Sequence, residues 1–362
     1  MLVENRQTLR LLIVMPSWVG DAVMATPAIT RIRHLRPGIT IGALVRPGID
    51  ELLDGTDFFD TIHVEARAGV MGPKRAAANV RANRYDTALL FTNSFATALI
   101  TRLAFIPRRI GYSRDSRAML LTDRLHTPKR PDGSWAPIPA VTYYWNAACA
   151  LLDLQPHDLS PGNTLPPGAV ISLNTTEAQE HAADDILAKA GISSDEPLAI
   201  LNPGGNNPAK RWPPDRYAAL ADHLARQRGM TILLNGSPAE AELVSHIADL
   251  AKSKGGPPPV ELPKLGMTIG ALKAITRRAQ IMITNDTGPR HIAAAFNIPI
   301  VSLFGPTDHR WTTIPASAGE QLILADPTLP EDELANDDPD RNSIDKIELD
   351  TVAAAVDELL VF

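Results

Sequence analysis

The sequence predicts an α/β protein made of two doubly wound domains. Short apolar segments, typical of buried parallel strands, alternate with amphipathic segments of helical spacing, and this alternation occurs twice along the chain. A proline-rich stretch over residues 154–169 separates the two series and predicts an interdomain linker. The length of 362 residues agrees with two domains, because a single hydrophobic core usually stops growing before that size.

In the first half, residues 11–15 predict a buried strand, because the segment is apolar on both faces. The helical segment that follows contains Thr26 and Pro27, which mark either a kink or the regular start of a helix. Further strands are expected over residues 39–45 and 87–91, and a loop is expected over residues 127–139.

The second half repeats the pattern. Strands are expected over residues 198–202, 231–235, 281–284 and 300–304, and helices over residues 213–228, 238–252, 289–296 and 347–360. The acidic segment 326–340 is expected to be a solvated loop. We therefore expect domains over residues 1–165 and 166–345. Residues 346–362 should add a C-terminal helix, for which the N-terminal domain is a candidate packing partner.

The composition, 44% apolar and 21% charged, is that of a globular protein. The net charge of −6 argues against general nucleic-acid binding, which needs a basic face. The single cysteine, Cys149, excludes an internal disulfide and a thiolate metal cluster, and its apolar neighbours predict a buried side chain. We see no secretory signal and no apolar run of membrane-spanning length, so we expect a cytoplasmic protein without a transmembrane segment.

The first candidate site follows the first strand directly, in the sequence Pro-Ser-Trp-Val-Gly-Asp over residues 16–21. Gly20 would let a ligand approach the backbone closely. Asp21 has two interpretations. As a structural residue it caps the following helix, and as a functional residue it is a general base that takes a proton from an attacking hydroxyl.

The second candidate site is the glycine-containing loop over residues 202–213, after the first strand of the second half. Its glycines and Lys210 fit the binding of a diphosphate, because the lysine supplies a positive point charge. The alternative is a surface loop in which Lys210 and Arg211 are solvated. Trp212, before a proline, is expected to be a packing residue at the start of a helix.

The third candidate site, residues 235–240, again follows an expected strand. Glu240 could accept hydrogen bonds from both hydroxyls of a ribose, as an acid near a strand end does in dinucleotide-binding folds. Glu242 is the competing residue for this role. The alternative is that both acids favour the positive end of the following helix.

The fourth candidate site joins a strand to a helix through Asn-Asp-Thr-Gly-Pro-Arg-His, residues 285–291. Thr287 and Pro289 suit the start of a helix, whose amide groups and dipole favour an anionic phosphate. Asp286 would repel a close diphosphate, so it is expected to accept hydrogen bonds from sugar hydroxyls or to organise the turn. His291 either donates to phosphate or packs as a neutral side chain.

These segments, in this order, resemble the family of the ADP-heptose:lipopolysaccharide heptosyltransferases, glycosyltransferase family 9, and within it the heptosyltransferase II members most of all. The segments that carry the likeness are residues 16–21, 92–95, 106–112, 208–213, 285–288 with His291, and 305–307. Several matching motifs in one order are far more specific than any one of them.

The resemblance implies a GT-B fold, in which two Rossmann-like domains face each other across a cleft. The N-terminal domain would bind the acceptor and the C-terminal domain the nucleotide sugar. The implied reaction transfers heptose, with inversion, from ADP-L-glycero-D-manno-heptose to a heptose of the lipopolysaccharide inner core. It would need no metal ion and no cofactor. The implied partners are the ADP-heptose donor and the lipopolysaccharide acceptor at the inner-membrane surface, where the enzyme would be peripheral; no nucleic acid is implied.

The same resemblance implies roles for single residues. Asp21 is the expected catalytic base, and Lys210 is expected to neutralise the diphosphate leaving group. Glu240 would bind the adenosine ribose, and Asp286 would hold heptose hydroxyls. The other expected donor-binding residues are Gly20, Thr287, Gly288 and His291.

The acceptor side is less defined. Asn93 lies in a matching segment, and Arg109, Arg114 and Arg117 form either a basic patch for a phosphorylated core sugar or solvated surface charges. Arg290 departs from the family pattern and would either contact phosphate or point to solvent. Two alternatives stay open: a related transferase with another nucleotide sugar or glycan acceptor, and a non-catalytic nucleotide-sugar-binding protein.

Overall fold

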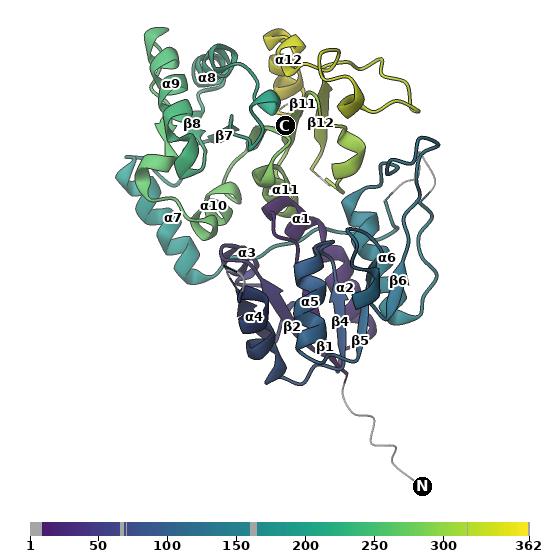
Figure 1. Ribbon diagram of the computed structural model, residues 1–362. Helices are drawn as coiled ribbons and strands as arrows, with labels where there is room; N and C mark the ends of the chain where they lie inside the picture. The colour runs from purple at the N-terminus through teal and green to yellow at the C-terminus, as the bar shows by residue number, and fades with distance from the viewer. Residues whose placement is uncertain (1–8, 66–68, 70, 160–164, 317, 361–362) are drawn as a thin grey trace. The chain divides into compact units, whose positions relative to one another are not determined.

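The computed structural model describes residues 9–65, 69, 71–159, 165–316 and 318–360 (Figure 1). The chain divides after Leu173 into two compact units, residues 1–173 and 174–362. This division lies slightly beyond the expected boundary at residue 165, inside the segment that follows the proline-rich linker.

The first unit contains a parallel sheet of six strands. They are β1 (Arg10–Val14), β2 (Thr40–Val45), β3 (Thr61–Val64), β4 (Thr87–Leu90), β5 (Arg108–Tyr112) and β6 (Asp123–Leu125). Their order is β3-β2-β1-β4-β5-β6, so the direction of strand addition reverses between β1 and β4. In open α/β sheets, ligands bind beyond the carboxyl ends of the strands at such a reversal.

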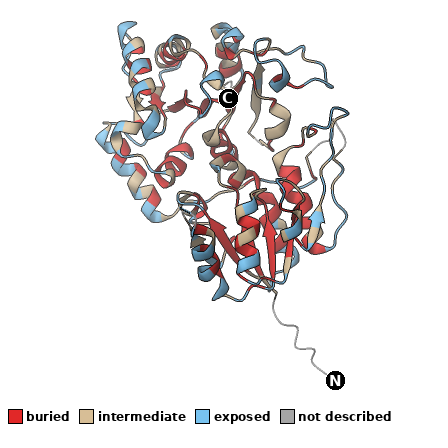
Figure 2. Ribbon diagram, viewed as in Figure 1, coloured by how far each residue is buried: buried red, intermediate tan, exposed pale blue. Residues whose placement is uncertain are grey.

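Helices cover both faces of this sheet. They are α1 (Val19–Met24), α2 (Thr26–Leu35), α3 (Ile49–Leu53), α4 (Gly72–Arg81), α5 (Phe95–Leu103), the 3-10 helix η1 (Ala118–Leu120) and α6 (Ala140–Leu152). Pro27 lies in the first turn of α2, so the chain starts a new helix there instead of kinking one helix. The sheet interior is buried, as the red strands in Figure 2 show.

The second unit repeats the arrangement with another parallel sheet. Its strands are β7 (Leu198–Asn202), β8 (Thr231–Leu234), β9 (Val260–Glu261), β10 (Ile281–Asn285), β11 (Ile300–Phe304) and β12 (Glu320–Leu324). Their order is β12-β11-β10-β7-β8-β9, and the reversal lies between β7 and β10. The loops after these two strands are therefore the expected ligand-binding loops of the second unit.

The second unit contains α-helices and short 3-10 helices. The α-helices are α7 (Glu177–Lys189), α8 (Pro214–Arg228), α9 (Ala241–Ser253), α10 (Ile269–Thr276), α11 (Gly288–Ala295) and α12 (Leu349–Leu359). The 3-10 helices are η2 (Pro208–Lys210), η3 (Pro238–Glu240), η4 (Leu262–Leu265), η5 (His309–Thr312), η6 (Ala335–Asp337) and η7 (Ile344–Lys346). The acidic segment 326–340 forms loop and turn around η6.

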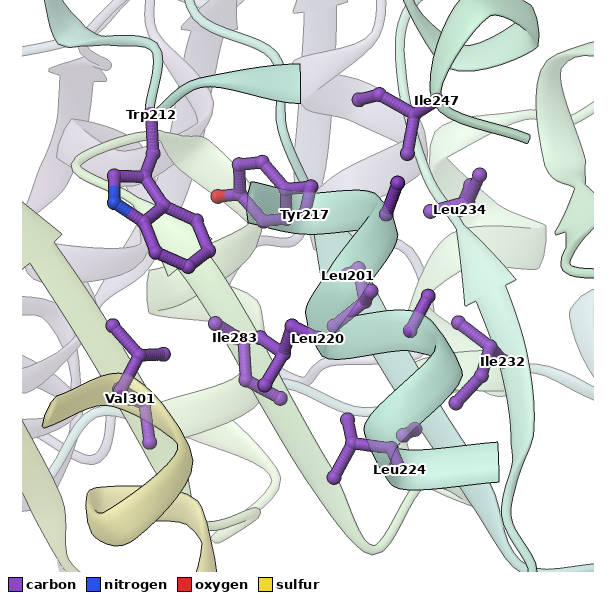
Figure 3. Close-up of a cluster of buried hydrophobic side chains, with 14 of the residues drawn as sticks. Leu201, Trp212, Tyr217, Leu220, Leu224, Ile232, Leu234, Ile247, Ile283 and Val301 are labelled. Atoms are coloured by element: carbon purple, nitrogen blue, oxygen red, sulfur yellow. The ribbon is translucent and has the colours of Figure 1, made fainter. Parts of the chain in front are cut away.

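Trp212 anchors the core of the second unit. It is 1% exposed, its ring meets that of Tyr217 edge-on at 5.1 Å, and its indole N–H donates to the carbonyl of Ile347 at 2.8 Å. Figure 3 shows both rings beside Ile283 and Val301 of the sheet. The expectation that Trp212 packs at the start of a helix is confirmed, and its burial fixes where the loop carrying Lys210 ends.

The C-terminal helix α12 belongs to the second unit. Its buried residues Val352, Ala355 and Val356 join the same hydrophobic cluster as Trp212, and the helix contacts α8, β11 and β12. The contacts of α12 with α8, β11 and β12 all lie within the second unit, and packing on the N-terminal domain stays a prediction. The apolar face of α12 is used within the second unit, because the outer strands β11 and β12 need a cover on that side.

Cys149 is buried in α6, as its apolar neighbours predict. Among the described residues, no helix combines the length and the apolar character needed to cross a membrane.

Candidate functional site

Asp21 lies in the first turn of α1, directly after the turn that follows β1. The N-cap position is occupied by Trp18, so Asp21 is not the capping residue. Its side chain is half-buried, and its Oδ1 accepts a hydrogen bond from the hydroxyl of Tyr144 at 3.1 Å. Asp21 is thus an acidic residue in the first turn of a helix, where the helix dipole interacts favourably with a negative charge.

Tyr144 on α6 donates the hydrogen bond to Asp21 and so helps to orient its carboxylate. Burial raises the pKa of Tyr144 well above its ordinary value, and the charge of Asp21 adds to the rise, so the phenol stays a donor. Sequence reasoning did not predict this pairing, because the two residues are 123 positions apart and Tyr144 lies in an apolar helix.

Lys210 and Asp286 meet at the reversal point of the second sheet. Lys210 is in η2 after β7, and Asp286 directly follows β10, which pairs with β7. The Lys210 Nζ lies 3.0 Å from Asp286 Oδ2. Burial acts to raise the pKa of Asp286, but the charges of Lys210 and Arg290 and the hydrogen bond from Lys210 outweigh it and hold that pKa below its usual range.

Two threonines from the next loop complete the surroundings of Asp286. The hydroxyl of Thr312 donates to its Oδ1 at 3.2 Å, and that of Thr307 to its Oδ2 at 3.4 Å. Both threonines follow β11, the neighbour of β10. The carboxylate is therefore fixed by three loops at one edge of the sheet, with a cation beside it.

Arg290 is a buried structural residue. Its side chain is 1% exposed and pairs with Glu320 on β12, with Nε to Oε1 at 2.6 Å and Nη2 to Oε2 at 3.0 Å. It also donates to Ser302 and to the carbonyl of Thr312. Neither expected alternative, a phosphate contact or a solvated charge, is correct, because the bidentate Glu320 pair holds the guanidinium inside the unit.

His291 is a buried, neutral histidine. It is 3% exposed, and burial together with the positive charge of Arg290 lowers its pKa to about 3. Its Nδ1 has no hydrogen-bond partner among the described residues. His291 lies in the first turn of α11, which begins at Gly288 and has Thr287 as its N-cap residue. It would therefore contact a ligand as a neutral hydrogen-bonding group and not as a cation.

The carboxylate of Glu240 accepts hydrogen bonds from two loops, the one after β7 and the one after β8. Its Oε1 accepts from the backbone N–H of Gly205 at 2.6 Å, and its Oε2 accepts from the backbone and hydroxyl of Ser237, both at 2.8 Å. Burial acts to raise the pKa of Glu240, but these hydrogen bonds lower it overall. A Cβ at Gly204 would collide with this carboxylate, so any larger residue there would displace Glu240 from its present position. Glu242, the competing acid, is exposed.

A network of buried asparagines fixes these loops, and the sequence interpretation did not identify it. Asn285 donates to the carbonyls of Pro203 and Gly204 at 2.8 and 3.0 Å, and Asn202 donates to Thr287 at 2.7 Å. Asn235 donates to Asn202 at 2.7 Å. One sequence feature could have indicated this network: an asparagine is the last residue of β7 and of β10, and another directly follows β8.

The arginines expected on the acceptor side are largely structural. Arg109 is 9% exposed, and its guanidinium donates to the backbone carbonyls of Ile106, Pro107 and Leu120. The structure therefore does not support an acceptor role for Arg109. Arg117 is fully buried, and burial lowers its pKa to about 10, so the expected basic patch of three arginines is not present.

Asn93 and Arg114 lie nearer the surface. The Oδ1 of Asn93 accepts from Tyr143 at 2.8 Å and from Arg117 at 3.1 Å. The guanidinium of Arg114 lies over the ring of Trp135, 4.2 Å from its centroid. Asn93 follows β4 and Arg114 follows β5, so both belong to the sheet edge that also carries Asp21.

The described residues contain no group of three or more histidine, cysteine, aspartate or glutamate side chains placed to hold a metal ion. Around Asp286, the nearest cations are Lys210 at 3.0 Å and Arg290 at 4.0 Å.

Solved structures share this fold along nearly the whole chain. A family 9 glycosyl transferase from Veillonella parvula aligns with a TM-score of 0.79 and 20% identity, over 98% of this chain and 97% of that one. ADP-heptose lipopolysaccharide heptosyltransferase II from Escherichia coli aligns with a TM-score of 0.76 and 24% identity, over 98% and 99%. A third structure, an Escherichia coli heptosyltransferase with ADP, aligns at 0.66 with 18% identity, over 97% and 100%. The fold is thus the α/β fold of the GT-B glycosyltransferases.

Sequence comparison gives the family. Residues 74–336 match glycosyltransferase family 9 (heptosyltransferase), and the chain belongs to this family of enzymes. Lipopolysaccharide heptosyltransferase 2 of Salmonella typhimurium is 28% identical over 319 residues, 84% of this chain and 85% of that protein. Lipooligosaccharide heptosyltransferase 2 of Haemophilus ducreyi is 30% identical over 314 residues, again 84% and 85%.

Proposed function

We propose that the protein transfers heptose from ADP-L-glycero-D-manno-heptose to a heptose of the lipopolysaccharide inner core. The observation that carries the proposal is the Lys210–Asp286 pair at the reversal point of the second sheet, where this fold binds nucleotides. The names of the relatives support the heptose donor and the lipopolysaccharide acceptor. A structural relative described with ADP supports adenine as the base.

In the second unit, a cationic and amide-lined site would take the donor. Lys210 and the amide groups at the start of α11, around Thr287 and Gly288, would face the diphosphate. Asp286 would accept hydrogen bonds from heptose hydroxyls, and Lys210 beside it offsets the repulsion between carboxylate and phosphate. His291, being neutral, would add a hydrogen bond without adding charge.

Glu240 would bind the adenosine ribose. Its carboxylate is ionised and already positioned by Ser237 and Gly205, and each carboxylate oxygen has more than one lone pair for hydrogen bonds. The same contacts mean that Glu240 also stabilises the loop after β7, so its two roles are coupled.

In the first unit, Asp21 would act as the general base, with Gly20 allowing the donor to approach the backbone. The acceptor oxygen attacks the anomeric carbon as the bond from that carbon to the diphosphate oxygen breaks. The proton of the acceptor hydroxyl passes to Asp21, and ADP leaves with the bonding electrons. A single displacement inverts the anomeric configuration.

Negative charge builds on the departing diphosphate during this step. Fixed amide dipoles and Lys210 would offset it, as preorganised donors do in other enzymes. We therefore propose that the reaction proceeds without a divalent metal ion. Because the acceptor is part of lipopolysaccharide, we also propose that the protein works on the cytoplasmic side, at the surface of the inner membrane. Asn93 and Arg114, at the sheet edge of Asp21, are the proposed acceptor contacts.

Release of ADP from ADP-heptose tests this function. The assay compares a heptosylated core acceptor with no acceptor, each with and without EDTA. We expect acceptor-dependent ADP release that EDTA does not reduce. A parallel series with UDP- and GDP-sugars tests the base: preference for one of these would remove the ADP-heptose assignment. Complete loss of activity in EDTA, restored by a divalent metal, would contradict the proposed mechanism.

A further inference from the structure

The helical layer of α4 and α5 has an unusual charge balance. Residues 71–114 contain eight lysine or arginine residues and a single acidic residue, Asp86, within a chain of net charge −6. Several of these basic residues are exposed on the two helices, namely Lys74, Arg75, Arg81 and Arg102. The helices contact each other and pack on the same face of the first sheet (Figure 1). Their cations therefore share one side of the unit.

The exposed face of α5 is apolar. Arg102 is the only charged residue in this helix of nine residues. Phe95 and Leu103 are 45% and 36% exposed, whereas Ala98 and Ile100 are buried against the sheet. A surface helix normally has polar residues on its outer side. A helix that is apolar on both sides and still exposed indicates an interaction surface.

Phe105 extends this apolar face in a conformation that usually requires glycine. Its φ is +61°, and its side chain is 68% exposed. The N–H of Phe105 donates to the carbonyl of Arg102, and that of Ile106 donates to the carbonyl of Thr101. These bonds define a helix end at which glycine is strongly preferred. The chain thus keeps an exposed aromatic ring at the cost of backbone strain.

Met119 adds a second exposed apolar side chain beside Phe105. It lies in η1 and is 77% exposed. The guanidinium of Arg109 donates to the carbonyls of both Ile106 and Leu120, at 2.5 and 2.7 Å. One side chain therefore binds the residue after Phe105 and the residue after Met119, and the two segments lie side by side.

We propose that these residues form a docking surface for the anionic lipid surface of the membrane that carries the acceptor. The α5 surface, as we call it, consists of Phe95, Leu103, Phe105, Met119, Arg81 and Arg102. Its apolar side chains would enter the boundary of the acyl chains, and its arginines would stay among the headgroups. This inference rests on the proposed function, because a lipopolysaccharide acceptor is membrane-anchored.

Arg81 and Phe105 combine positive charge and exposed apolar area at one place. The Arg81 guanidinium lies over the Phe105 ring, 4.5 Å from its centroid, and donates to the carbonyl of Leu103 at 2.6 Å. Charge and apolar area are thus held together at one place, as a headgroup–acyl boundary requires. In addition, α5 begins just after β4, and β4 pairs with β1, which precedes Asp21. A helix lying along the membrane would place that sheet edge near the lipid.

The charge balance also argues against a second copy as the occupant. A twofold contact would bring the same arginine-rich face of each copy together, and residues 71–114 provide only one carboxylate, Asp86, to offset the repulsion. Anionic lipids provide both negative headgroups and an apolar phase.

Vesicle cosedimentation of the full chain tests the proposal. We expect binding to vesicles of phosphatidylcholine with phosphatidylglycerol, little binding to phosphatidylcholine alone, and loss of binding as salt increases. Phe105→Gly should weaken binding about tenfold or more, because it removes a large apolar side chain. Arg81→Gln and Arg102→Gln should each weaken it about fivefold.

Phe105→Gly also separates docking from folding. Glycine is favoured at φ +61°, so this variant should unfold at the same temperature as the wild type or higher. Leu322→Ser is the matched control, because Leu322 is an exposed apolar residue, 39% exposed, on β12 of the second unit. It should bind vesicles like the wild type.

Three results would overturn the proposal. The wild type could fail to bind anionic vesicles at low salt, or Phe105→Gly could bind them equally well. Sedimentation velocity could also show a wild-type dimer that Phe105→Gly dissociates without changing vesicle binding, which would make the surface an interface between copies. Transfer to a soluble acceptor fragment tests the proposed function separately, because it needs no membrane and should be unaffected by Phe105→Gly.

Discussion

Lys210 Nζ lies 3.0 Å from Asp286 Oδ2, and this ion pair joins the loops that follow β7 and β10. The Asp286 side chain is 10% exposed, so its charge would be costly without a partner. Arg290, with its Nη1 4.0 Å from Asp286 Oδ1, provides a second cation from inside the unit. A carboxylate held between two cations can stay ionised beside a phosphate group, which is what a sugar-binding acid next to a diphosphate needs.

Lys210→Met should weaken ADP binding about tenfold or more, because it removes a charge-assisted contact to phosphate, typically about 1.5–3 kcal/mol. It should also raise the pKa of Asp286, since Lys210 is the main group that lowers it. Isothermal titration with ADP measures the first effect. Lys264→Met is the control, because it removes the same charge from an exposed pair with Glu261 in the same unit. Equal ADP affinity in both variants would show that Lys210 does not face the diphosphate.

Arg290→Leu should destabilise the protein by about 3–5 kcal/mol, because it leaves Glu320 without its buried partner. The double variant Arg290→Leu with Glu320→Leu should recover most of this loss, since an apolar pair leaves no uncompensated charge. Urea unfolding followed by circular dichroism gives the free energies. If the single and double variants were equally unstable, the ion pair would not be the source of the effect.

The free energy of unfolding should decrease as the pH decreases, partly because of His291. Its pKa in the folded protein is about 3, below the ordinary 6.5, so the unfolded chain takes up the proton first as pH falls. The stabilisation is complete above pH 6.5 and is lost progressively between pH 6.5 and 3. His291→Gln should flatten this dependence by up to about 1.4 kcal/mol per pH unit.

Unfolding midpoints measured across this pH range test the role of His291. The control is His246→Gln, which changes an exposed histidine on α9. A pH dependence of stability that is unchanged in His291→Gln would mean that His291 is not buried as a neutral group.

The sequence predicted the central strands well because their signal is local. Residues 198–202 and 300–304 are continuous apolar runs, and β7 and β11 occupy the same residues. Strand β3 was not predicted, because it lies at the edge of the sheet and most of its side chains are exposed, so no apolar run marks it.

Site geometry could be predicted only in part. The sequence predicted that Lys210 and Asp286 each lie in a loop after a strand. Their contact could not be predicted, because the two residues are 76 positions apart and meet only through the strand order. For Arg290 the sequence left a phosphate contact and a solvated side chain as alternatives, because its partner Glu320 is 30 residues further along the chain. Local sequence shows which groups can carry charge, whereas burial and pairing follow from the tertiary fold.

The role of Asp21 as the base is the central claim, and single-turnover transfer from ADP-heptose by Asp21→Asn tests it most directly. The variant keeps the shape of the side chain and an oxygen for the Tyr144 hydrogen bond, but cannot take up the proton. We expect transfer to slow by about 10²–10⁴-fold, with an unchanged dissociation constant for ADP-heptose. Transfer at a near-wild-type rate, with the donor bound equally well, would contradict the account.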